Sequence, residues 1–254
     1  MDSTREPQLR SAARTSVRWW VRLFDPTRYL REIQGVRPRL ARLQREGESF
    51  IGAASAILLA ILLQYSLPNR VSHYQRWIFP VVAVLLLGVL LVGHRGRIDR
   101  QSRALRGLLL LTIVIMSIAN GVAAIRLVRD LVEGEGIRTP RTLLLAGAAI
   151  WLTNVIVFAL VYWVFDRGGP AARFLVKGTP PDLLFPQQAT EREAEIWEPV
   201  FFDYFYTSFT NATAFSPTDV MPLSRWAKFA MMIESSVSLV LAILVVARAV
   251  NILR

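Results

Sequence analysis

The 254-residue sequence contains no cysteine, which excludes disulfide scaffolds, thiolate metal sites and thiol nucleophiles. It also contains little charge: 19% of its residues are charged, below the roughly 25% of soluble domains. Its apolar residues, 53% of the chain, gather in blocks of about 20 residues, which is close to the thickness of a bilayer core. The sequence therefore predicts an integral membrane protein.

The sequence also lacks a Gly-rich phosphate loop, a zinc-binding spacing and a Ser-His-Asp grouping. We therefore predict no enzymatic activity, no cofactor and no metal site. The net charge is +11, and only Lys177 and Lys228 among the 30 basic residues are lysines. In a hydrophobic chain whose arginines flank apolar blocks, such a charge favours cytoplasmic loops over nucleic-acid binding. We expect the lipid bilayer, and no nucleic acid, as a partner.

The N-terminal region, residues 1–49, holds eleven arginines and no apolar run long enough to span a bilayer or to serve as a secretion signal. Aromatic residues alternate with arginines near residues 18–24, a pattern that suits a helix lying in the membrane interface. A solvated basic tail is the alternative. We interpret this region as cytoplasmic or interfacial, followed by a transmembrane domain at residues 50–254.

The transmembrane domain is predicted to be an all-α bundle of five or six transmembrane helices. The first four spans contain no acidic residue and are rich in Leu, Val, Ile and Ala, as helices that contact lipid must be. Several Gly and Pro residues interrupt the chain between residues 166 and 198, so no helix continues through this stretch. The predicted spans are 50–67, 78–92, 108–128, 143–165, 199–215 and 229–252.

The distribution of basic residues predicts the orientation. If the N-terminus is cytoplasmic, the loops on that side carry twenty basic residues and those on the other side carry six. The positive-inside rule then predicts a multi-pass protein of the inner (plasma) membrane, with its N-terminus in the cytoplasm and the loop at 68–77 outside. The segment 199–215 either crosses, which gives six spans, or re-enters, which gives five. The charge rule favours crossing, but sixteen helical residues cover only about 24 Å of a core of about 30 Å.

Residues 199–219 combine five phenylalanines with many polar side chains. A polar stripe at membrane depth points at protein or water, because hydrocarbon leaves polar groups unpaired. Glu234 lies inside the last span, where an acid costs about 2.5–3.5 kcal/mol on insertion scales; the alternative is an interfacial acid paired with Arg225 or Lys228. We expect Asn120, Asn154 and Asn251 to form hydrogen bonds between helices. The predicted polar path comprises Asp203, Tyr206, Thr207, Ser208, Thr210, Asn211, Thr213, Asp219, Glu234 and Ser238.

The same segment resembles the C-terminal signature of a bacterial multi-spanning membrane protein family described as a domain of unknown function. The matching residues are Asp203, Tyr206, Ser208, Phe209, Thr210, Phe215 and Asp219, in the order Asp-x-x-Tyr-x-Ser-Phe-Thr, Phe and Ser/Thr-Asp. The chain departs from the family at Ala212, Thr213 and Ala214, where the family has Gly-Met-Thr. The resemblance covers roughly residues 50–253 and implies four upstream spans and a final hydrophobic helix, but no activity.

A weaker resemblance is to the pore module of tetrameric cation channels. There, a Thr-rich pore helix precedes an acid, a Pro-Leu-x-Arg element and an inner helix with an early Glu. The similar residues here are Tyr206 to Thr210, Asp219, Pro222 to Arg225 and Glu234. The potassium filter is absent, because the glycine-free run Ala214-Phe215-Ser216-Pro217 stands in its place. The resemblance therefore implies four copies but no potassium selectivity.

These observations predict a small channel-like membrane protein, a homo-oligomer with a polar path for inorganic cations formed by residues 199–219 and the last helix. A single polar helix face cannot enclose a pore, so symmetric copies are expected to close it. The alternative is a non-conducting membrane scaffold whose basic N-terminal region binds lipid or a partner. The two differ in whether the polar stripe faces a hydrated path.

Overall fold

The computed structural model of the chain describes residues 48–68, 75–94, 97–98, 103–133, 139–175, 180–188, 197–213 and 219–252. These residues all belong to one compact unit, residues 46–254. The predicted basic region at 1–49 lies outside the described residues except for its last two, and so does the segment 214–218 that stands where a channel filter is expected.

Most of the described residues are helical, and the main helices are α3 (Ile51–Ser66), α4 (Gln75–His94), α5 (Arg103–Val132), α6 (Pro140–Phe165), α9 (Phe201–Thr213) and α10 (Arg225–Ile252). Three stretches are long and apolar enough to cross a membrane: Arg106–Val132, Pro140–Gly168 and Arg225–Ile252. Helix α3 and the stretch Pro80–Val89 are apolar but shorter. The apolar helices confirm the prediction of a helical membrane protein. A count of five or six crossings stays a prediction.

The outward faces of the helices are apolar, as contact with lipid requires. Leu62 on α3, Ile125 on α5 and Ile243 on α10 are each more than half exposed. The inward face of α3 consists largely of alanines, which let neighbouring helices approach closely. Large apolar side chains thus face outward and small ones face the neighbouring helices. Such a surface fits a bilayer better than water, because large exposed apolar patches are rare on soluble proteins.

One end of the bundle is defined by aromatic contacts between α3, α6 and α9. The ring of Trp163 lies 6.2 Å from that of Phe50 and 5.8 Å from that of Phe201, measured between centroids. The short strands β1 (Glu48–Ser49) and β2 (Arg97–Ile98) pair antiparallel, so α4 ends where α3 begins. We call this the Asp166 end, after the first residue beyond α6. At the opposite Leu143 end, one apolar cluster buries Leu67, Leu127, Leu143, Val245 and Ala249.

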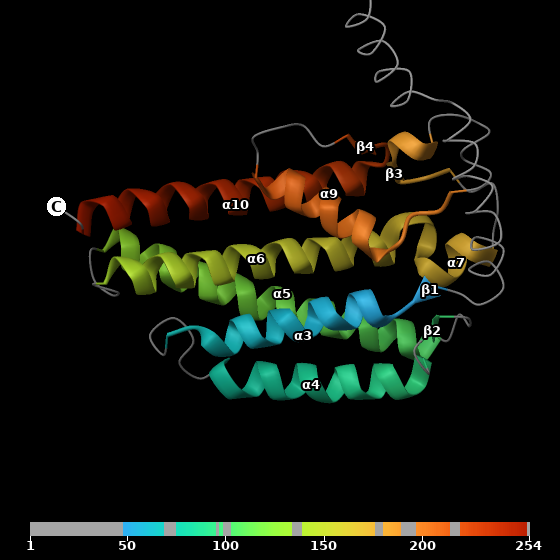
Figure 1. Ribbon diagram of the computed structural model, residues 1–254, viewed down its shortest axis with the longest axis horizontal. Helices are drawn as coiled ribbons and strands as arrows, with labels where there is room; N and C mark the ends of the chain where they lie inside the picture. The colour runs from blue at the N-terminus through green and yellow to red at the C-terminus, as the bar shows by residue number, and fades with distance from the viewer. Residues whose placement is uncertain are drawn as a thin grey trace, which may run out of the picture. The chain divides into compact units, whose positions relative to one another are not determined.

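Helices α9 and α10 run parallel, and both begin at the Asp166 end (Figure 1). Along α9, Phe201 contacts Trp163 and the later Phe209 contacts the earlier Trp151, so α9 is antiparallel to α6. Along α10, Trp226 contacts Phe165 and the later Ser238 bonds to the earlier Asn154, so α10 is antiparallel to α6 as well. Helix α9 ends near the middle of α6, where the rings of Phe209 and Trp151 lie 5.6 Å apart. The chain must return to the Asp166 end before α10 starts. This geometry favours the re-entrant alternative over the crossing one.

The chain after α6 is folded back onto the Asp166 end by a sharp turn and several short elements. In the 3-10 turn η1 (Asp166–Gly168), Arg167 adopts a left-handed conformation with φ 50°, and Gly169 follows with φ 99°. A Cβ at Gly169 would lie 2.8 Å from the carbonyl of Val164, so glycine is required there. The elements that follow are α7 (Pro170–Leu175), β3 (Leu183–Leu184), η2 (Pro186–Gln188) and β4 (Met221–Pro222), and β3 pairs antiparallel with β4.

Candidate functional site

A buried polar seam runs between α6, α9 and α10, with the side chain of Glu234 near its centre. Glu234 is 0% exposed. Its Oε2 accepts hydrogen bonds from the hydroxyl of Tyr162 and the amide of Asn211, each at 2.6 Å. Its Oε1 contacts the hydroxyl of Ser208. One acid therefore joins three helices through uncharged partners.

The charged groups that the sequence offers as partners for Glu234 lie elsewhere. The side chains of Arg225 and Lys228 are exposed, nine and six residues before Glu234 on α10. Among the residues that the structure describes, the ion pairs involve Asp166, Arg167, Glu198, Arg129 and Glu133, and none involves Glu234. The interpretation of Glu234 as an interfacial acid paired with Arg225 or Lys228 therefore does not match the structure.

The amide of Asn211 is held in one orientation by its other neighbours. Its Nδ2 donates to the carbonyl of Met231 at 3.0 Å as well as to Glu234. Its Oδ1 accepts from the hydroxyl of Ser235 at 3.0 Å. Because a carbonyl can only accept, Nδ2 must be the atom that faces Met231 and Glu234.

Ser208 completes the contact between α9 and α6. Its hydroxyl lies 2.7 Å from the backbone carbonyl of Val155 and also contacts Glu234. Both the serine and the glutamate are fully buried. Farther along the seam, the amide of Asn154 donates to Ser238 at 3.1 Å, so an expected interhelical partner of α6 does meet α10. A second expected partner, Asn120, accepts from Gln64 at 3.1 Å and joins α5 to α3. The third, Asn251, is exposed near the end of α10.

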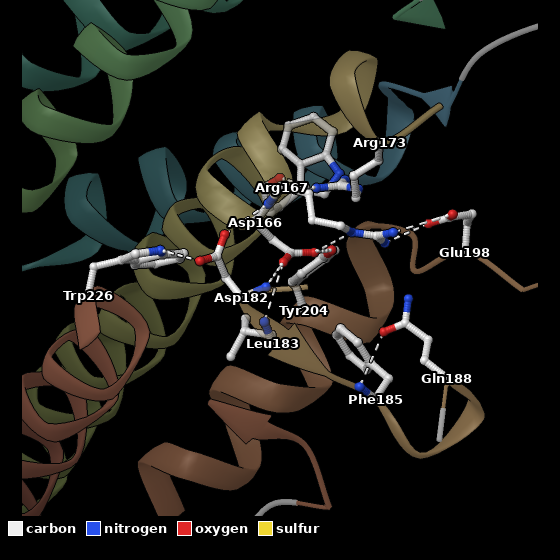
Figure 2. Close-up of polar contacts among 11 residues, drawn as sticks. Asp166, Arg167, Arg173, Asp182, Leu183, Phe185, Gln188, Glu198, Tyr204 and Trp226 are labelled. Atoms are coloured by element: carbon white, nitrogen blue, oxygen red, sulfur yellow. Dashed lines mark hydrogen bonds and ion pairs between the residues drawn. The ribbon is translucent and has the colours of Figure 1, made fainter. Parts of the chain in front are cut away.

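A second polar cluster closes the seam at the Asp166 end, centred on the buried carboxylate of Asp166 (Figure 2). Oδ2 of Asp166 accepts from the hydroxyl of Tyr204 at 2.6 Å, and Oδ1 accepts from the backbone N–H of Asp182 at 2.9 Å. Asp182 in turn accepts from the indole of Trp226 at 2.9 Å and from the backbone N–H of Arg167 at 3.0 Å. These bonds fasten the loop at 180–188 to the starts of α9 and α10.

Two arginines lie beside the carboxylate of Asp166 and the ring of Tyr204. Arg167 forms a 2.6 Å ion pair with Glu198, and its Nε lies 3.6 Å from the carboxylate of Asp166. Arg173 is buried and donates to the carbonyl of Trp163 at 2.7 Å, with its guanidinium 5.0 Å from the ring centroid of Tyr204. Figure 2 shows both guanidinium groups beside Asp166 and Tyr204. The buried acid at this end is therefore compensated by cations.

The two clusters lie on the same helix faces. Tyr162 and Asp166 are four residues apart on α6, as are Tyr204 and Ser208 on α9. Trp226, Glu234 and Ser238 follow at spacings of eight and four residues on α10. Residues at these intervals share one side of a helix. A continuous line of polar groups therefore reaches from the Asp166 end to the level of Asn154.

Beyond the end of α9, the line of polar groups gives way to an open groove. It has a volume of about 330 Å³ and is bounded by α6, the end of α9 and α10. The lining is almost entirely apolar, with Thr213 as its one hydroxyl-bearing residue. The groove therefore begins where α9 stops and extends toward the Leu143 end.

The structure brings together only part of the polar path predicted from the sequence. Ser208, Asn211, Glu234 and Ser238 meet in the seam. Thr207 is buried, and its hydroxyl donates to the carbonyl of Asp203 within α9. The remaining hydroxyls and acids lie outside the seam: Thr210 and Thr213 bond within α9, while Tyr206 and Asp219 are exposed.

Asp203 has a local structural role. Its Oδ2 accepts the backbone N–H of Val200 at 2.8 Å, just before α9 begins. This is the reach-back bond of an acidic residue in the first turn, which satisfies an otherwise orphan N–H. Asp203 therefore stabilises the first turn of α9 and does not line the polar path that the sequence predicts.

Sequence reasoning missed Tyr162, Asp166, Asp182 and Tyr204. The available signal was the pair Tyr162 and Asp166, four residues apart across the end of an apolar span. An acid at that place also looks like an ordinary loop charge, so only its partners identify it. Among the described residues, no three His, Asp or Glu side chains are grouped to hold a metal ion.

Comparison of the chain with protein-family models, with characterised proteins and with solved structures finds no match. The resemblances to the bacterial family and to the channel pore module therefore stay predictions.

Proposed function

We propose that this chain is a channel-like membrane protein that conducts cations along the seam between α6, α9 and α10. The observation that carries this proposal is the burial of Glu234, whose partners Tyr162, Ser208 and Asn211 are all uncharged. An acid within a membrane helix is costly, and such acids mark ion pathways and proton relays. An amide or an apolar residue would join the same helices at lower cost.

Re-entrant α9 supports the proposal. Backbone that enters a membrane without crossing it is tolerated where it is buried in protein or lines a cavity. Helix α9 has 13 residues, about 20 Å at 1.5 Å per residue, and it places Ser208 and Asn211 against Glu234. Helices that stop inside the membrane form the substrate and ion sites of many transport proteins.

The proposed path lies inside one protomer. A pore enclosed by symmetric copies would require the acids to face a shared lumen, whereas Glu234 is enclosed by its own chain. The homo-oligomer, and the four copies that the channel resemblance implies, stay predictions about assembly. With the N-terminus in the cytoplasm, the Asp166 end is the cytoplasmic side and the groove opens toward the outside.

Cysteine labelling tests this topology in a chain that has no cysteine of its own. If α9 re-enters, Ser72→Cys, between α3 and α4, and Asn251→Cys, at the end of α10, lie on the same side of the membrane. Both single-cysteine proteins should react with an impermeant thiol reagent added outside intact cells. If α9 crosses, one of the two will react only after lysis.

The non-conducting scaffold remains the second candidate, because the seam's hydrogen bonds also join three helices firmly. A flux assay separates the two. Purified protein in liposomes should carry cation flux down a salt or pH gradient, and Glu234→Gln should abolish it. Glu133→Gln, a matched change of an acid exposed at the end of α5, should leave the flux intact. If wild-type liposomes show no flux of any cation, the channel proposal fails and the scaffold is favoured.

A further inference from the structure

The contacts between Glu234 and its neighbours require a proton beyond those of the hydroxyl and amide groups that face it. The hydroxyl of Ser208 has a single proton but lies within bonding distance of two oxygens, the carbonyl of Val155 and Oε1 of Glu234. The carbonyl can only accept, so that bond must use the serine proton. The contact between Ser208 and Oε1 then needs a proton from the glutamate.

The other oxygen of Glu234 is not available to carry that proton. Oε2 receives a hydrogen bond from Nδ2 of Asn211, whose orientation is fixed by the carbonyl of Met231 and the hydroxyl of Ser235. It also receives the hydroxyl of Tyr162. Oε2 is therefore the acceptor oxygen of a carboxylic acid, and Oε1 is its hydroxyl.

We propose that Glu234 is a proton-binding site, protonated on Oε1 in this structure, and that the cation carried along the seam is the proton. The identification of the transported cation as the proton rests on the proposed function. The protonation of Glu234 is independent of that function. With the proton on Oε1, each hydrogen bond that Glu234 makes with Ser208, Asn211 and Tyr162 has one donor and one acceptor. A neutral acid also avoids the cost of an unpaired buried charge.

The groups around Glu234 support this assignment from every packed element. On α6 the titratable neighbours are Tyr162, which donates to Glu234, and Asp166, which is held by Tyr204 and Arg167. On α9, Asp203 bonds to Val200 instead of the seam. Helix α5 meets α10 through apolar residues near the Leu143 end. None of these described groups supplies a positive charge that would hold Glu234 as a carboxylate.

Proton release has a defined structural consequence. When Oε1 loses its proton to solvent, the hydroxyl of Ser208 can rotate from Val155 to the new carboxylate. The bond between Ser208 and Glu234 is then kept, while the bond that ties α9 to the backbone of α6 is lost. Protonation of Glu234 is thereby coupled to the attachment of re-entrant α9.

Infrared spectroscopy of the protein in nanodiscs tests the protonation directly. Wild-type protein at neutral pH should show a carboxylic-acid C=O band that disappears in Glu234→Gln. Because Gln keeps a donor toward Ser208 and an acceptor toward Tyr162 and Asn211, this variant should fold normally. Tyr162→Phe should shift the band to higher frequency, since one donor to Oε2 is removed. If no band in the wild-type spectrum depends on residue 234, the protonated acid is refuted.

Flux measurements in liposomes test the identity of the ion. A pH gradient should produce proton flux that is lost in Glu234→Gln, and a potassium gradient at equal pH should produce none. Potassium flux at equal pH that is lost in Glu234→Gln would refute the proton as the ion while the channel proposal stands. A residue-234 band without flux of any ion would refute the proposed function and leave the protonated acid in place.

Discussion

The same three helices bury two acids, Asp166 and Glu234, in opposite electrostatic settings. Asp166 accepts from a tyrosine and from a backbone N–H, and Arg167 lies 3.6 Å away. Glu234 also accepts from a tyrosine, but its remaining partners are an amide and a hydroxyl. A buried carboxylate is stable where a cation and several donors compensate it. The comparison indicates that Asp166 fastens the fold as an ion, whereas Glu234 is suited to gain and lose a proton.

Position along the helices explains why the settings differ. Asp166 lies where α6 ends and a polar loop folds back, so arginines and free backbone N–H groups are within reach. Glu234 lies nine residues into α10, beside helical backbone whose N–H groups are already bonded. Only side chains can serve it there, and all of those present are neutral.

The largest expected effect is at Asp166. Asp166→Ala should lower the free energy of unfolding by about 3–5 kcal/mol, because it leaves a buried arginine and several donors without their acceptor. Unfolding of the purified protein in mixed micelles measures this. Glu133→Ala, which removes only an exposed pair with Arg129, should cost about 0–1 kcal/mol. Equal losses in the two variants would contradict a structural role for Asp166.

Glu234 should respond to charge and to shape in different ways. Glu234→Ala should cost about 2–3 kcal/mol, since it leaves Tyr162, Ser208 and Asn211 with unsatisfied buried groups. Glu234→Gln preserves these bonds and should stay within about 1 kcal/mol of wild type. The same unfolding assay applies. A strong stabilisation by Gln would show that the wild-type protein carries a buried charge, contrary to the contrast with Asp166.

Packing alone joins α6 and α10 beyond the seam, and a glycine pair tests it. A Cβ at Gly147 would lie 2.8 Å from a methyl group of buried Val245, so Gly147→Ala should cost about 1–3 kcal/mol by overpacking. Gly121→Ala on α5 meets nothing within 4 Å and should be neutral or stabilise by about 0.5–1 kcal/mol. If both variants have the same free energy of unfolding, the close approach of α6 and α10 does not stabilise the Leu143 end.

The smallest effect is expected at Asp203. Asp203→Ala removes the acceptor of the Val200 N–H and should cost about 0.5–1 kcal/mol, the range of lost helix caps. Cation flux in liposomes should be unchanged, because the side chain lies outside the seam. A loss of cation flux would instead show that Asp203 belongs to the conducting path. Its role would then no longer differ from that of Glu234.

The apolar blocks predicted where the helices lie. The polar residues of 199–215 did not predict which of their side chains bond to other helices. The 166–198 stretch ends α6 as its Gly and Pro residues indicate. In α9, however, the hydroxyls of Thr207, Thr210 and Thr213 bond to carbonyls of their own helix. Threonine in a membrane helix can satisfy itself in this way, so a stripe of hydroxyls does not reveal which face meets protein.

The sequence by itself determined that the chain enters a membrane, where its helices lie and that Glu234 is an anomaly, because burial of long apolar runs and the cost of an acid within them are local properties. Only the tertiary structure decided that α9 runs parallel to α10, that Asp166 faces arginines and that Glu234 faces none. Those facts depend on contacts between residues far apart in the chain, such as Asn154 and Ser238, which are 84 positions apart. The direction in which α9 packs against α6 and α10 determines these contacts. The residues of α9 alone do not determine that direction, because it depends on the helices around it.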